Sequence, residues 1–432
     1  MLALFGSGYV CISRRITNFG GFYSYAREGL GRLAGGGAAY LALLSYNAAV
    51  VGIFGGLAYF ASVVLGDLGA AVPWQVCAVV CFLLVAVLSW FEVTLSSKVL
   101  GFLLSAEVLV LLVFNVAVLV QRGFHGFSLS VCAPSVVFGA GFGVSLMFAF
   151  GSSVGFEATA LYGEEARETH RSVPRATYIA LAVITVFYLV TSWAALAAVG
   201  AGRAQSLAAA DLAANKTFVF EEGTRLLGTA YTDVMAVLVV TSLFAAFLAF
   251  HANTARYHVA LARDGLLPRR FAHTHPRHGS PVAASSLQLV IVAVVTIGFA
   301  GAGQEPYLGM GTSLYSLGVL GIVALQAIAA VSIVSYFLRH RRGESLVASV
   351  LAPALGAVGL VAGVVVMVRN YSRLTASPLA RVNDLPWALV AAAVLGAVVA
   401  SVVRLGSFST EDHALTPAPH AANTSYPAPT GK

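Results

Sequence analysis

Charged residues are scarce in this sequence. Of its 432 residues only 10% are charged, whereas 59% are hydrophobic, and the mean hydropathy is +0.85. Soluble domains carry about 25% charged residues, so the composition excludes a soluble globular protein and predicts a polytopic protein of the lipid bilayer. The net charge of +7 would suggest a nucleic-acid partner in a soluble chain. Here arginines in cytoplasmic loops explain it, and no nucleic acid is expected.

Cysteine is rare, and cofactor motifs are missing. The four cysteines lie in or beside apolar runs without metal-ligand spacing, which is typical of small buried hydrophobic residues and not of a disulfide framework. The sequence contains no G-x-x-x-x-G-K-[ST] motif for ATP and no His-Glu-x-x-His motif within an apolar run. We therefore expect no cofactor, no metal site and no enzymatic activity. Energy for any transport must come from a gradient or from exchange.

Long apolar runs occupy most of the chain. Because a helix needs about 20 apolar residues to cross a bilayer, the hydropathy pattern predicts one partial and ten full spans. They lie near 1–13, 34–66, 72–92, 99–120, 136–163, 176–199, 233–255, 281–300, 311–338, 346–368 and 385–403. We expect a single all-α transmembrane domain over 1–405. A disordered cytoplasmic tail, rich in Pro, Ala, Thr and His, is expected over 406–432.

The basic residues set the predicted orientation in the cell membrane. If the segment after the first span is cytoplasmic and the spans alternate, most of the 25 Lys and Arg residues fall on the cytoplasmic side. This bias places the C-terminus in the cytoplasm. Arg369, Arg373 and Arg381 are exceptions, because they fall outside, between the last two spans. Nothing in the sequence explains them.

One predicted span contains a polar interruption. The segment FGSSVGFEATALYGEEAR, over 150–167, includes small and acidic residues that a plain membrane helix does not need: Gly151, Ser152, Ser153, Gly155 and Glu157. In one interpretation, Gly151 and Gly155 form a close-contact face between two helices. In the other, the helix is unwound over 151–155, and its freed backbone groups bind the charged groups of a polar substrate. The paired serines, Glu157 and the charged segment that follows favour unwinding.

Three motifs together resemble the amino acid–polyamine–organocation (APC) permease superfamily. FGSSVGFEATALYGEEAR and the following RSVPRA resemble its sixth transmembrane helix and next loop. ARYHVALARDGLLPRRF, over 255–271, resembles the loop after its eighth helix, and NFGGFYSYAREGLGR, over 18–32, resembles the exit of its second helix. The resemblance implies two five-helix inverted repeats. It also implies an amino acid or amine substrate, bound midway between broken helices one and six and moved by alternating access.

The resemblance and the residue types together define the candidate site residues. The predicted substrate contacts lie around the interruption and on the third helix of the family's fold: Phe150, Gly151, Ser152, Ser153, Gly155, Tyr46 and Asn47. The residues predicted for coupling or gating are Glu157, Glu107, Glu164, Glu165 and Arg167. Glu107 lies about 13 Å along its helix from Lys98, so its carboxylate must face the bundle. It either takes up a proton or stays neutral and hydrogen-bonded.

The sequence departs from the family's pattern at its start. Because the Gly-Gly-x-Tyr motif begins only at Gly20, helix one and the start of helix two are expected to be missing, through a misassigned start codon or in a degraded relative. Gly6-Ser7-Gly8 resembles the break of helix one, but the twelve residues from there to Gly20 cover only about 18 Å of helix. The expected function is a proton-coupled or exchanging permease for an amino acid or related amine. The alternative is a transport-dead or ligand-sensing membrane protein of the same fold.

Overall fold

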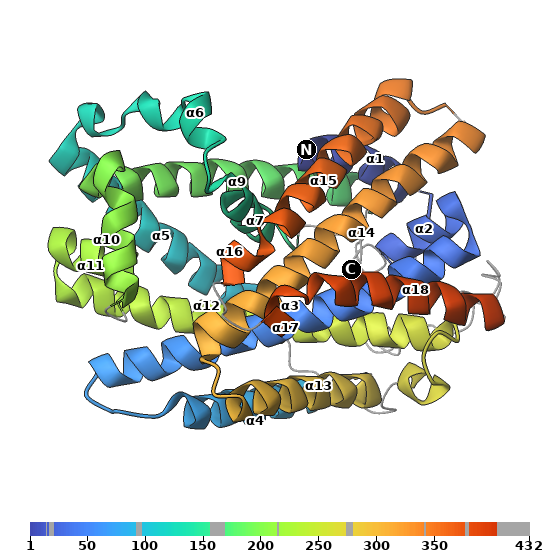
Figure 1. The fold of residues 1–432 in the computed structure, drawn as a ribbon, viewed down its shortest axis with the longest axis horizontal. Helices are drawn as coiled ribbons and strands as arrows, with labels where there is room; N and C mark the ends of the chain where they lie inside the picture. The colour runs from blue at the N-terminus through green and yellow to red at the C-terminus, as the bar shows by residue number, and fades with distance from the viewer. Residues whose placement is uncertain are drawn as a thin grey trace, which may run out of the picture.

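The structure is a computed structural model, which describes residues 1–13, 15–16, 21–91, 97–155, 169–213, 216–273, 280–340, 343–375 and 380–403. Across these ranges the chain is helical and contains no strand (Figure 1). Seven helices are long and apolar enough to cross a membrane, and four shorter apolar helices accompany them. Each predicted span contains one of these helices. The prediction of an all-α polytopic membrane protein is confirmed.

The helices follow one another with short connections. The first half contains α1 (Leu2–Ser13), α2 (Phe22–Leu30), α3 (Arg32–Asp67), α4 (Trp74–Trp90), α5 (Ser97–Arg122), α6 (Pro134–Val137), α7 (Phe142–Gly151) and α9 (Thr169–Val199). The second half contains α10 (Ala201–Ala213), α11 (Phe218–Leu227), α12 (Thr229–Arg263), α13 (Val282–Gly301), α14 (Thr312–Arg339), α15 (Ala352–Arg369), α16 (Tyr371–Thr375), α17 (Ala380–Asn383) and α18 (Pro386–Val402). Short π-helical turns, η4 (Pro306–Gly311) and η5 (Val347–Leu351), precede α14 and α15.

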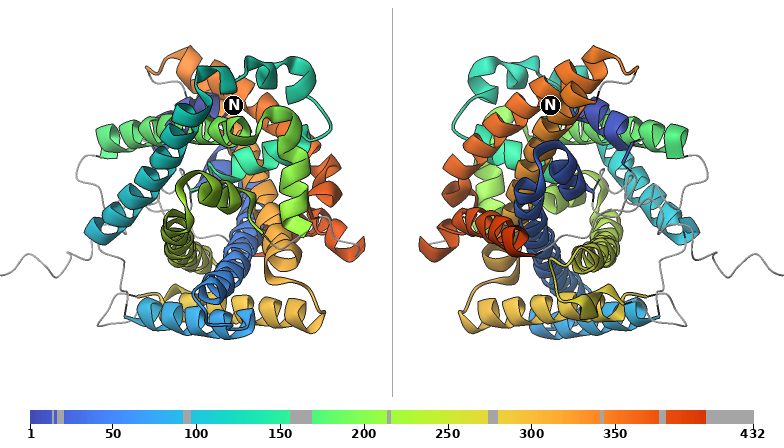
Figure 2. Two further views of the ribbon diagram at one scale, coloured as in Figure 1. Left: turned by 90° about the vertical axis from the view of Figure 1, so that its left-hand side faces the viewer. Right: turned by 90° about the vertical axis from the view of Figure 1, so that its right-hand side faces the viewer.

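Helices α3 and α14 form the centre of the bundle. Most of each apolar stretch is buried, 72% for α3 and 78% for α14, and in Figure 2 other helices surround both of them. They approach to backbone contact, because a Cβ atom on Gly52 would lie only 2.4 Å from the backbone nitrogen of Tyr315. On one side, α4 and α13 lie together along α3 (Figures 1 and 2). Small residues thus let two long helices pack as a central pair.

Helix α18 is held against α3 by a second close approach. A Cβ atom on Gly396 would lie 2.1 Å from the carbonyl oxygen of Gly36, and one on Gly36 would lie 2.3 Å from Cβ of Ala400. Because a contact under 3.0 Å requires something to shift, both positions need glycine for this packing. The contact joins the first long helix of the described chain to the last.

We expect Gly396→Ala to destabilise the protein by about 1–3 kcal/mol, because overpacking a close helix contact forces the backbones apart. The measurement is thermal unfolding of the purified protein in detergent. Gly298→Ala in α13 is the matched control, since its Cβ would meet nothing within 4 Å, and it should be neutral or gain up to about 1 kcal/mol. Equal unfolding temperatures for the two variants would contradict the close packing of α18 on α3.

Candidate functional site

Helix α7 ends within the bundle, and its regular hydrogen bonding stops there. The N–H of Ser152 still bonds the carbonyl four residues earlier, at 2.8 Å, but the N–H groups of Ser153 and Val154 bond carbonyls only three residues earlier, at 2.9 and 3.2 Å. Gly155 has a φ of +110°, a conformation that other residues rarely adopt. The helix is therefore interrupted after Gly151, as the unwinding interpretation predicts.

A side chain from α14 binds the carbonyl at the end of α7. The hydroxyl of Tyr315 donates to the Gly151 oxygen at 2.9 Å. A Cβ atom on Gly151 would lie 3.2 Å from the Tyr315 ring and 3.3 Å from Val319, so glycine also permits a close contact between α7 and α14. The two interpretations of the motif are thus compatible, because the interrupted helix end is also a packing face.

The other candidates near the interruption bond or pack locally. The hydroxyls of Ser152 and Ser153 both donate to the carbonyl of Ala149, at 3.0 and 3.2 Å. Ser153 is buried and Ser152 is partly exposed. Phe150 is buried and packs on α15, where a Cβ atom on Gly363 would lie 3.1 Å from its ring. The predicted role of Phe150 and the serines in binding a substrate stays a prediction.

The two candidates on α3 lie against α12. Tyr46 stacks on Tyr257, with ring centroids 4.8 Å apart and planes 25° apart. The side-chain nitrogen of Asn47 lies 3.1 Å from Nε2 of His258. The structure therefore places the candidates in two groups, one around the end of α7 at Gly151 and one in a polar layer between α3 and α12.

This polar layer extends to α13 through residues that the sequence analysis missed. Nδ1 of His258 lies 3.3 Å from the carbonyl of Ala284. His251 and Gln288 are also fully buried, at 1% and 0% exposure. Neither ring nitrogen of His251 and neither amide atom of Gln288 has a hydrogen-bond partner among the described residues. A single polar residue in an apolar helix forms no periodic pattern, although its position in a span is itself a reason to suspect a function.

Glu107 is the coupling candidate that the structure describes. It is half-buried on α5 and faces the bundle as predicted, because the hydroxyl of Ser242 on α12 donates to its Oε2 at 3.0 Å. No cation lies within ion-pair distance of Glu107 among the described residues. The remaining coupling and gating candidates lie outside the described residues, and their roles stay predictions: Glu157, Glu164, Glu165 and Arg167.

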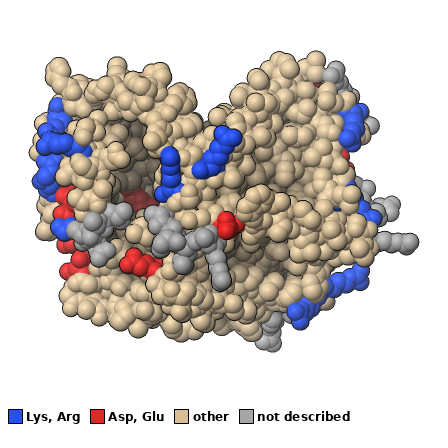
Figure 3. Space-filling model, in the orientation of Figure 1, with Lys and Arg blue, Asp and Glu red and all other residues tan. Residues whose placement is uncertain are grey.

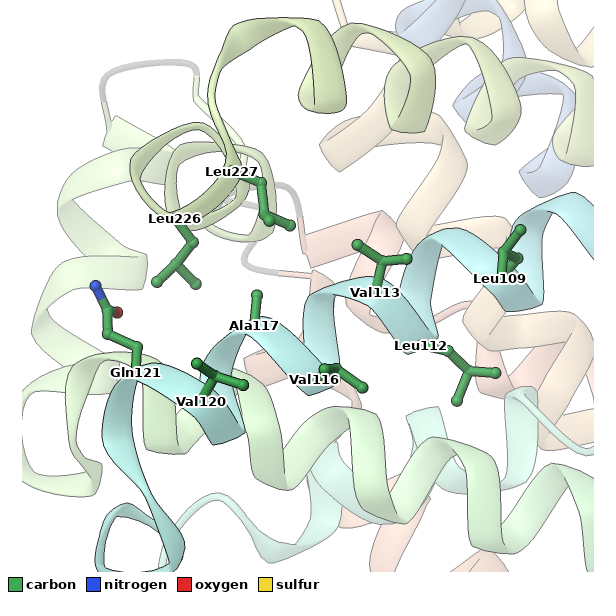
Figure 4. A pocket seen from close by; sticks show the side chains of 9 residues that line it. All are labelled: Leu109, Leu112, Val113, Val116, Ala117, Val120, Gln121, Leu226 and Leu227. Atoms are coloured by element: carbon green, nitrogen blue, oxygen red, sulfur yellow. The ribbon is translucent and has the colours of Figure 1, made fainter.

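Two apolar hollows adjoin these residues, and neither suits a charged substrate. One, of about 570 Å³, lies between α1, α7 and α9 and includes Phe150 and Tyr178. The other, of about 590 Å³, runs along α5 beside Leu226 and Leu227 of α11, and Gln121 is its one polar lining residue (Figure 4). No charged side chain lines either hollow. The end of α7 therefore remains the candidate for substrate binding.

A buried carboxylate joins two of the sequence motifs at the end of α12. The hydroxyl of Tyr23 on α2 donates to Oδ2 of Asp264 at 2.8 Å, and Nη1 of Arg27 lies 3.8 Å from the same oxygen. The hydroxyl of Tyr40 donates to the carbonyl of Leu266 at 2.9 Å. Burial raises the pKa of Asp264, and the Tyr23 hydrogen bond and Arg27 charge offset part of this rise. Motifs that are far apart in sequence meet here as a clamp.

The raised pKa of Asp264 predicts a pH-dependent stability that Asp264→Asn removes. As pH falls, the folded protein binds a proton at Asp264 before the unfolded chain does. This group therefore adds stability on acidification, by about 1.4 kcal/mol per unit of pKa difference, until the unfolded chain is also protonated. Between pH 7 and pH 4 the free energy of unfolding of the wild type should rise relative to the variant. Asp67→Asn, at the exposed end of α3, is the control, and an identical pH slope for Asp264→Asn and the wild type would refute the prediction.

Comparison with known proteins identifies the family. Three curated proteins described as uncharacterized transporters, from Mycobacterium bovis and two strains of Mycobacterium tuberculosis, are each 32% identical to this chain over 151 residues. The alignment covers 35% of this chain and 31% of each relative, so it spans about a third of their length. Residues 1–399 match the family described as amino acid permease. Because this match covers most of the 432 residues, the chain belongs to the amino acid permease family of the APC superfamily, a family of membrane transporters.

Proposed function

We propose that this protein is a secondary transporter that moves an amino acid or a related amine across the cell membrane by alternating access. The observation that carries the proposal is the interruption of α7 after Gly151, inside the bundle. Lipid cannot satisfy the backbone groups that an interrupted helix frees, whereas a polar substrate can. Interrupted helices bind charged substrate groups and coupling ions in this way in other transporters. Membership of a permease family supports the proposal.

In this proposal the substrate ammonium group binds the carbonyl of Gly151. That oxygen is available to a competitor because the Tyr315 hydroxyl is a neutral donor, and a hydrogen bond from a charged donor is about twice as strong. The buried Ser153 and the turn at Gly155 lie directly after this carbonyl and contribute the remaining polar groups. Phe150 supports the site through its packing on α15.

Uptake into proteoliposomes tests the proposal directly. The purified chain is reconstituted and supplied with a panel of labelled amino acids and amines, with counterflow measured beside net uptake. Saturable transport of at least one compound supports the proposal. Binding without uptake or counterflow would instead favour the ligand-sensing alternative, and absence of both binding and transport across the panel would reject the proposal.

Two variants examine the carbonyl of Gly151. Gly151→Leu should abolish substrate binding, because its side chain would fill the contact with Tyr315 and Val319. Since that change also disturbs packing, Tyr315→Phe provides a second variant that keeps the ring and removes the competing hydroxyl. It should tighten substrate binding by up to about tenfold, the equivalent of one hydrogen bond. Tyr40→Phe, which loses a hydroxyl bond to Leu266, is the matched control. Unchanged affinity in Tyr315→Phe would place the ammonium site elsewhere.

Glu107 is the described candidate for carrying a coupling proton. We expect Glu107→Gln to abolish the pH dependence of uptake between pH 5 and pH 8 while exchange continues, because glutamine keeps the Ser242 hydrogen bond but cannot ionise. Glu28→Gln on the exposed face of α2 controls for loss of one negative charge. A pH profile equal to that of the wild type would make Glu107 a packing residue.

A further inference from the structure

The end of α7 opposite the interruption is held by the segment that follows α15. Nη1 of Arg373, in α16, donates to the carbonyl of Ala140 at 3.1 Å, just before α7 begins. Asn370 packs on the first turn of α7, where a Cβ atom on Gly143 would lie 2.3 Å from its side-chain nitrogen. Since α7 has ten residues, this attachment lies about 15 Å from the interruption. A group that binds beside Arg373 therefore acts on the helix that carries the candidate site.

Two arginines of this segment have no acidic partner among the described residues. Arg369, the last residue of α15, and Arg373 are both exposed, and neither belongs to the ion pairs found in the described chain. Arg373 donates only to neutral oxygens, those of Ala140 and Asn370, and both bonds use Nη1. Its Nη2 and Nε remain available. On the face drawn in Figure 3, basic side chains stand at the edge of a hollow in the molecule.

The position of these arginines opposes the orientation that the other loops favour. They belong to the exceptions that the positive-inside pattern leaves on the outer side, so their charge serves something other than topology. A guanidinium group pairs with a carboxylate through two parallel hydrogen bonds. A hollow edged by charge of one sign raises the local concentration of ligands of the opposite sign. Both properties suit an anionic ligand that enters from the outside.

We propose that Arg369 and Arg373 form an outer recognition site for the carboxylate of the substrate. This inference rests on the proposed function and narrows it, since it assigns an amino acid with a free carboxylate and not a simple amine. The carboxylate binds the available nitrogens of Arg373, with Arg369 adding charge. Because Arg373 also bonds the segment that leads into α7, the outer site and the interruption act on one short helix.

The test compares an amino acid with its decarboxylated amine. The Arg369→Gln/Arg373→Gln double variant and the wild type are reconstituted in neutral phosphatidylcholine vesicles, and KM and kcat for uptake are measured at low and high ionic strength. For the amino acid, KM should rise about tenfold, equivalent to about 1.4 kcal/mol, with kcat within about twofold. For the amine, KM should stay constant. Added salt should weaken the wild type more than the variant.

Three further measurements decide the outcome. Arg203→Gln, an exposed arginine on α10, should leave KM unchanged and so control for net charge. An equal KM for the double variant and the wild type would overturn the inference while the proposed function stands. An effect that appears only with phosphatidylglycerol vesicles would assign the arginines to lipid headgroups and also overturn it. Equilibrium binding to the purified chain is measured in parallel, and a wild type that neither binds nor transports the amino acid would overturn both proposals.

Discussion

A helix interrupted within a membrane must find partners for the backbone groups it frees, and α7 meets this demand at Gly151 through the hydroxyl of Tyr315. The position of that hydroxyl depends on the centre of the bundle. Gly52 of α3 lies directly under the backbone of Tyr315, so the packing of α3 on α14 fixes where the hydroxyl points. A contact between two long helices thus determines whether a short third helix can end where it does.

Helix α7 is attached at both ends to the elements that follow it in the second half of the chain. Its inner end bonds Tyr315 of α14, its Phe150 packs on α15, and its outer end is bonded by Arg373 of α16. By contrast, α3 and α12 meet through the stacked rings of Tyr46 and Tyr257 and through their polar layer. The candidate site therefore lies where a short helix with few attachments meets a closely packed core.

The sequence was sufficient to predict the fold class, because apolar runs of span length allow little except membrane helices. It also predicted the interruption of α7, since glycine and serine pairs are disfavoured in a plain span. It could not identify Tyr315, because an isolated tyrosine in an apolar helix acquires a partner only when helices pack. His251 and Gln288 were missed for the same reason. Packing and unwinding were separate interpretations of Gly151, and in the structure they coexist.

The buried side chains of His251 and Gln288 have a consequence for the durability of the protein. A buried polar group without a partner costs about 1–3 kcal/mol, whereas an apolar residue of similar shape costs little or nothing. The described scaffold therefore holds less stability than its packing allows, at two positions on α12 and α13 that lie outside the α7 region. A programme to obtain a longer-lived form of the protein in detergent would begin with these two residues, because there the gain in stability leaves the interrupted helix untouched.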